Sequence, residues 1–168
     1  MKLHAGLTVN GRAYASGDEI PGLFVYPFFL IHMLAFGVAG FALAYSGAPI
    51  EIAFMHGGIA IAVYVIFYLA IFGLDEVKWM FINAGLGLFG IISQINWILS
   101  LFGKHVGDYP AYVHVIPFLY FVLYTFLIRH AVLDLLGVRD DETRRPRVEF
   151  GYVGVSLALY LALHFLEG

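Results

Sequence analysis

Short polar joints divide the 168-residue chain into five long apolar segments. These segments lie at residues 23–45, 51–72, 79–102, 109–136 and 150–166. The first four are long enough for an α-helix to cross a bilayer, which takes roughly 20 apolar residues, and the fifth, with about 17, is at the lower limit. The pattern therefore predicts an all-α integral membrane protein, a bundle of five transmembrane helices of which four are long and the fifth is short.

The first 22 residues have a different pattern, which predicts a small β-hairpin and a turn-rich joint. Apolar and polar residues alternate from Leu3 to Val9, and Asn10-Gly11 is a strong signal for a two-residue hairpin turn before a return strand at 12–14. Because an isolated hairpin is marginally stable in water, we expect it to pack either on the cytoplasmic loops or on a neighbouring subunit. The chain thus divides into residues 1–22 and a single membrane domain at 23–168.

Positive charge falls almost entirely on one side of the predicted membrane. Of the nine Lys and Arg residues, only Lys104 follows the third segment and precedes the fourth. The other basic residues precede the first segment, separate the second from the third, or lie at or after the end of the fourth. Basic loops resist translocation, so the prediction for a plasma or inner membrane is a cytoplasmic N-terminus and, if the fifth segment crosses, an external C-terminus. The alternative for this short segment is an interfacial or re-entrant helix, which would place the C-terminus inside.

The amino-acid composition excludes several classes of function. Hydrophobic residues make up 61% of the chain and charged residues 12%, against about 25% charged in a typical soluble domain. The chain has no cysteine, which excludes disulfides and thiolate chemistry, and its few basic residues form no stripe for nucleic acid. No motif indicates a reaction, so we expect a non-enzymatic protein whose partners are the lipid bilayer and other membrane helices.

One face of the third segment carries small and polar residues at helical spacing. They are separated by four, three, four and three positions: Asn83, Gly87, Gly90, Gln94 and Trp97. Glycines let a second helix approach closely, and amides hydrogen-bond across such contacts. The leading hypothesis is therefore a protein that acts through helix packing, as a homo-oligomer or as a subunit of a larger membrane complex. In an oligomer the same face is the best candidate for lining a pore.

Histidines within the segments suggest an alternative, a b-type haem protein for membrane electron transfer. The predicted topology places His56 and His114 at one outer level, and His32 and His130 at one inner level. A b-type haem takes two imidazoles at the same depth. The directions of two of these side chains argue against haem binding. His114 and His130 are 16 residues apart and would face nearly opposite sides of one helix. His130 also has a local partner one turn later in Asp134.

A metal site at the outer end is the remaining alternative. Glu51, His105 and Asp108 share that end with His56 and His114, and together they offer the carboxylates and imidazoles that transition metals bind. No HExxH or similar helical spacing accompanies them. The sequence therefore leaves three interpretations open: packing, haem binding and metal binding.

Overall fold

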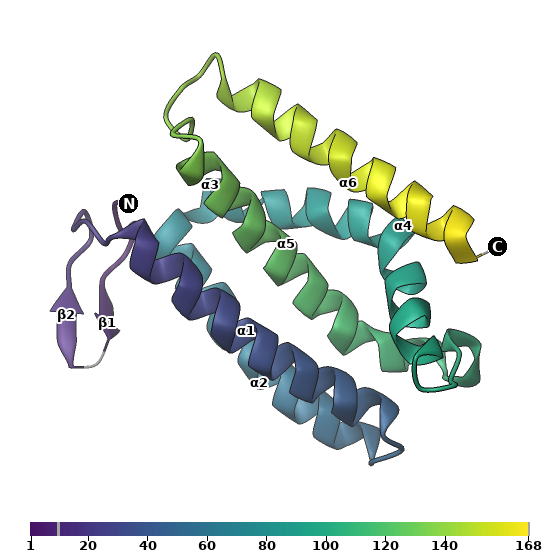
Figure 1. Cartoon of the computed structure of the whole chain (residues 1–168). Helices are drawn as coiled ribbons and strands as arrows, with labels where there is room; N and C mark the ends of the chain where they lie inside the picture. The colour runs from purple at the N-terminus through teal and green to yellow at the C-terminus, as the bar shows by residue number, and fades with distance from the viewer. Residues whose placement is uncertain (10, 168) are drawn as a thin grey trace.

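The structure is a computed structural model that describes residues 1–9 and 11–167, without the side chains of Val9, Leu23, Phe24, Phe89, Leu163, His164, Leu166 and Glu167. It is mostly helical, with one two-stranded hairpin at the N-terminus (Figure 1). The strands are β1 (Leu7–Val9) and β2 (Arg12–Tyr14). The long helices are α1 (Gly22–Tyr45), α2 (Ile50–Phe72), α4 (Trp79–Ser100), α5 (Val115–Leu135) and α6 (Arg145–Glu167). Three short pieces connect them: α3 (Leu74–Val77), η1 (Val106–Asp108) and η2 (Ala111–His114).

Three of the described helices are long and apolar enough to cross a membrane. They are Val25–Tyr45, Ile50–Phe72 and Ala111–Leu135, and a fourth span is present if the bent pair Leu74–Leu88 and Gly90–Ser100 is counted as one. The third segment was predicted as one span, and in the structure its helix turns by 58° between Leu88 and Gly90. This bend in α4 is visible in Figure 1.

Helix α5 is the centre of the fold, and the other long helices pack around it. It contacts α1 and α2 on one side and α4 on the other, while α6 covers α4 (Figure 1). Accordingly 44% of its most apolar stretch is buried, against 28% in α1 and in α2. An aromatic core that includes Phe29, Tyr68 and Phe126 fills the space between α1, α2 and α5. A second apolar cluster, including Tyr45 and Ile95, lies toward the opposite end of the bundle.

The N-terminal hairpin was predicted, and the structure confirms it. Leu7 pairs with Tyr14 in antiparallel register, and Gly11 has the positive φ of 75° that the turn requires, while Asn10 lies outside the described residues. The segment before the hairpin is anchored on the end of α2, where the backbone N–H of His4 donates to the carbonyl of Ala70 at 2.8 Å. The hairpin is therefore held against the bundle, as its marginal intrinsic stability demands.

Two helix starts differ from the sequence pattern. A 3₁₀ turn precedes α5, so Pro117 falls in the first turn of the helix, where its missing N–H costs little and causes no kink. Helix α6 begins at Arg145, five residues before the predicted apolar segment. Charged side chains among its first five residues pair with residues of α3 and α5, which accounts for this early start. These early charged residues form part of the candidate site.

Candidate functional site

A network of charged side chains lies where α5 ends and α6 begins, and Arg129 is at its centre. This side chain is only 1% exposed. Its guanidinium pairs with Glu76 of α3, Nη1 to Oε2 at 3.1 Å, and with Glu149 of α6. The same group lies 3.9 Å from the ring centroid of Trp79, a cation–π contact. Because a buried charge without partners is very costly, Arg129 needs these contacts, and in making them it joins α3, α5 and α6.

Arg145 completes the ion pairing from the first turn of α6. Its guanidinium pairs with Glu76 and with Glu149, the latter from Nε to Oε1 at 2.9 Å. Burial alone would raise the pKa of Glu76, but hydrogen bonds from Arg145 and Arg129 outweigh burial and hold this pKa below its ordinary value. Glu76 is therefore an ionised acceptor at neutral pH, which fits a structural ion pair better than a general acid.

His130 lies fully buried between this network and the aromatic core. Its ring stacks on Phe72 with the centroids 4.3 Å apart. Nδ1 lies 3.0 Å from Nη1 of Arg139, and Nε2 lies 3.2 Å from Nη1 of Arg129. Guanidinium groups only donate, and neutral imidazole has one acceptor nitrogen, so His130 can accept from only one of them. Oε2 of Glu76 lies 3.5 Å from Nε2, which favours the tautomer with the proton on Nε2 and Nδ1 accepting from Arg139.

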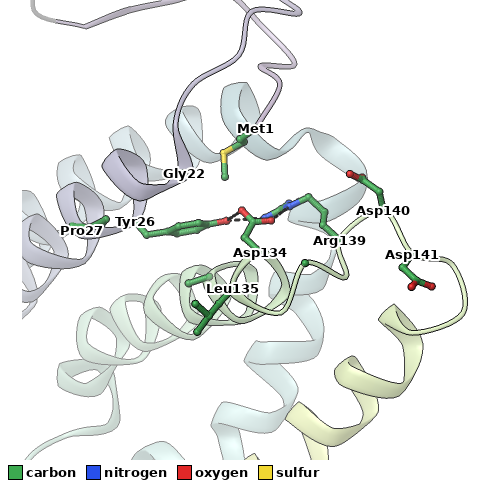
Figure 2. Close-up of a pocket in the computed structure, with 11 residues that line it drawn as sticks. Met1, Gly22, Tyr26, Pro27, Asp134, Leu135, Arg139, Asp140 and Asp141 are labelled. Carbon is green, nitrogen blue, oxygen red and sulfur yellow. Dashed lines mark hydrogen bonds and ion pairs between the residues drawn. The ribbon is translucent and has the colours of Figure 1, made fainter.

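Tyr26, Asp134 and Arg139 form a second part of the network, in which the carboxylate lies between a phenol and a guanidinium (Figure 2). The Tyr26 hydroxyl donates to Oδ2 of Asp134, and Nε of Arg139 pairs with Oδ1. Nη2 of Arg139 also donates to the Tyr26 oxygen at 2.7 Å. These groups border a cavity of about 870 Å³, and Asp140 and Asp141 also line it. The polar groups of this part of the network therefore line an accessible cavity.

The network as a whole is charge-balanced. Three guanidinium groups face three carboxylates around one neutral imidazole, and each carboxylate accepts from at least one guanidinium. A nucleophile or general base needs a free lone pair within reach of substrate, and these carboxylates are already engaged. The arrangement can therefore hold α1, α3, α5, α6 and the loop after α5 together. We call it the ionic clamp, because its geometry suits a structural link better than a catalytic centre.

Sequence reasoning missed this clamp. Asp134 was predicted as the local partner of His130, but it pairs with Tyr26 and Arg139 instead. Arg129 was predicted at or beyond the end of the fourth segment, whereas it lies inside α5, six residues before Leu135. The available signal was an Arg-His pair inside an apolar run. Two buried ionisable residues demand partners, and the acids near the ends of neighbouring segments could supply them.

Two different helices contact the predicted stripe on the third segment, near the bend of α4. The ring of Phe121 on α5 packs against Gly87, where an added Cβ would come within 2.8 Å of it. The ring of Tyr160 on α6 packs against Gly90 more closely still. Both glycines thus serve contacts within the chain, and the predicted close helix approach is made by aromatic side chains.

The polar members of this stripe have three different environments. Asn83 is 1% exposed, and neither atom of its amide has a hydrogen-bond partner among the described residues. Gln94 is half-buried and lines a groove between α1, α4 and α5. Trp97 is 54% exposed. Pore lining by this stripe stays a prediction.

The structure gives the candidate haem ligands partners of other kinds. His56 stacks on Phe36 at 5.5 Å, and its Nδ1 is buried without a hydrogen-bond partner in the described part of the chain. Nδ1 of His114 lies 2.7 Å from the hydroxyl of Tyr45. At the other level, His32 is exposed with Nδ1 2.7 Å from a backbone carbonyl one turn earlier in α1, and His130 belongs to the clamp. Binding of haem by either pair stays untested.

The outer candidate metal ligands are exposed. Glu51 lies in the first turn of α2, and Asp108 accepts from the backbone N–H of His105 at 2.7 Å, which shapes the loop before η1. Among the described residues, no three His, Asp or Glu side chains are close enough together to hold a metal ion.

Comparison with known proteins found no family model, curated protein or solved structure that matches the chain. The function is therefore argued from the geometry and charge of these residues.

Proposed function

We propose that this chain is a polytopic integral membrane protein that acts through helix packing, as a homo-oligomer or as a subunit of a larger membrane complex. Its outward surface supports the membrane location. Ile31 on α1 is 65% exposed, and Met55 and Ile59 on α2 are each 64% exposed. Apolar surface of this extent would cause aggregation in water, whereas acyl chains cover it at no cost in a bilayer.

The orientation follows the charge distribution. The end of the bundle that carries Lys78, Arg139 and Arg145 is proposed to face the cytoplasm, because basic segments resist translocation. The N-terminal hairpin, anchored on the end of α2, lies at the same end. With α6 as a crossing helix, the C-terminus lies outside.

The observation that carries the packing proposal is that some helix glycines face the interior of the bundle, whereas others face outward from it. Gly40 and Gly57 lie against Tyr120 and Ile116 of α5, and in both cases an added Cβ would meet a side chain within 3.1 Å. Those glycines are needed for the fold of one chain. Gly154 on α6 has open space within 4 Å of the same point, so the fold of one chain does not require it.

Gly154 belongs to an outward series of small residues on α6. Ala158 and Ala162 follow at intervals of four, and all three are exposed. Small residues spaced by four let the backbones of two membrane helices approach closely, and this contact is a common basis of association in lipid. We therefore place the contact with a second copy, or with a partner helix, on this face of α6. The glycines of the α4 stripe are already covered by Phe121 and Tyr160.

Single-cysteine cross-linking tests the proposal, because the native chain contains no cysteine. Ala158→Cys should cross-link in native membranes with a short thiol-specific reagent, and Ile31→Cys, which is also exposed but lies on α1, should not. Gly154→Leu should lower the oligomer fraction in nanodiscs, measured by light scattering.

Gly58→Leu is the matched control, since Gly58 on α2 also has open space where a side chain would begin. A Gly58→Leu protein that dissociates while Gly154→Leu stays assembled would place the contact on α2 and reject α6. A monomer that carries no co-purifying partner would reject the packing function altogether.

A further inference from the structure

A long apolar groove lies between α1, α4 and α5, on the half of the bundle away from the ionic clamp. Its volume is about 900 Å³. Its lining extends from Met33 on α1 to Ser46 directly after that helix, which corresponds to about 20 Å at a helical rise of 1.5 Å per residue. The lining is mainly apolar or aromatic, with Gln94 as its amide and Lys104 as its cation.

Lys104 differs from the other cations whose pairing is described above. The ammonium donates one hydrogen bond to the backbone carbonyl of Tyr45 at 2.9 Å, which fixes it beside the end of α1. Among the side chains that the structure describes, no carboxylate lies within ion-pair distance of it, whereas Lys78 is paired with Asp75. An ammonium has three donors, so two remain available to an anion.

We propose that this groove binds an anionic phospholipid, with one acyl chain between α1, α4 and α5 and the phosphate on Lys104. The proposal rests on the membrane placement proposed above. At about 20 Å the groove is as long as one leaflet with its headgroup region, which is half of a bilayer roughly 40–45 Å thick. Its apolar walls are complementary to an acyl chain, and the ammonium of Lys104 at its end is complementary to the charge of the headgroup.

Other occupants fit less well. A soluble anion would contact Lys104 but leave the apolar walls uncovered. A neutral lipid would fill the walls but leave the ammonium without a counter-charge. Only a ligand that combines a long apolar chain with a terminal anion satisfies both parts of the groove.

Native mass spectrometry of protein released from nanodiscs tests the proposal. The nanodiscs contain equal amounts of phosphatidylglycerol and phosphatidylcholine with identical acyl chains. Wild-type protein should retain phosphatidylglycerol in preference to phosphatidylcholine, and Lys104→Gln should reduce this preference about fivefold, the effect of one basic residue near anionic headgroups. Lys78→Gln, which removes an exposed cation at the opposite end, should leave the preference unchanged.

A second pair of variants tests the groove itself. Ala42 lines the groove and Ala35, on the same helix, does not, while both are exposed. Ala42→Phe should reduce retention of both lipids, and Ala35→Phe should not. Wild-type protein without a preference for phosphatidylglycerol, a preference that survives Lys104→Gln, or equal effects of the two phenylalanines would each overturn the proposal. Extraction of the chain from membranes by alkaline carbonate would instead refute the membrane placement.

Discussion

Replacement of Arg129 by Met tests whether the clamp holds the fold together. The side chain of Arg129 is 1% exposed, and those of its partners Glu149 and Glu76 are 12% and 18% exposed. Without Arg129, each of these carboxylates still pairs with Arg145. Removal of one member of a buried ion pair costs about 3–5 kcal/mol, because the other charge stays buried. Since Arg145 still pairs with both carboxylates, we expect a loss of unfolding free energy at the lower end, about 3 kcal/mol.

Trp79 provides the assay, because its ring lies 3.9 Å from the Arg129 guanidinium. The chain has two tryptophans, so Trp97→Phe leaves Trp79 as the single reporter of unfolding by denaturant in micelles. Arg144→Met, at an exposed position, is the control and should change stability by no more than about 0.5 kcal/mol.

The double variant makes this test sharper. Arg129→Met combined with Glu149→Met removes a positive and a negative charge together and leaves Glu76 paired with Arg145. Replacement of a whole buried pair by apolar side chains is often neutral, so the double variant should be more stable than Arg129→Met alone. If Arg129→Met is as stable as the Arg144→Met control, or if the two losses simply add, the clamp does not stabilise the fold in the way proposed.

Three further outcomes can be measured separately. Gly90→Val should lower the melting temperature by several degrees in micelles, because its side chain would collide with the Tyr160 ring and separate α4 from α6. The pKa of Glu76 is held below its ordinary value of 4.5, so its contribution to the stability of the fold is complete at neutral pH and should decline as the pH falls below that value. Unfolding measured as a function of decreasing pH should show this loss in wild type and not in Glu76→Gln. Purified protein from haem-sufficient cells should show no Soret band, since His56 and His114 lie against aromatic partners; a band that His114→Ala removes would establish the haem alternative.

Much of the helical framework could be predicted because it depends on local composition. The first two apolar segments, at 23–45 and 51–72, correspond to α1 and α2 to within a residue at their starts. Proline precedes each of these helices, and Gly73, with a φ of 82°, ends α2. The hairpin was equally local, because the turn signal and the alternating pattern are adjacent in the sequence.

The clamp and the bend could not be predicted in the same way, since both depend on residues far apart in the chain. Glu76 and Arg129 are separated by 53 positions, and Glu76 and Arg145 by 69. No periodic pattern reports such a pairing. The predicted stripe on the third segment includes Gly87 and Gly90, but its spacing could not show that rings from two different helices pack on them on either side of a bend.

The depth of Arg129 explains how a charged cluster can coexist with an apolar bundle. Six residues separate it from the end of α5, which places it about 9 Å along the helix from that end. A cation at this depth is costly if it faces lipid. Here Glu76, Glu149 and the ring of Trp79 surround the guanidinium, and its exposure is only 1%. The charge is therefore neutralised within the protein, and the carboxylates come from α3 and α6, which lie beyond or at the ends of the apolar segments. This arrangement requires α6 to begin before its apolar stretch, so the charged residues at the start of that helix are a structural requirement of the buried arginine.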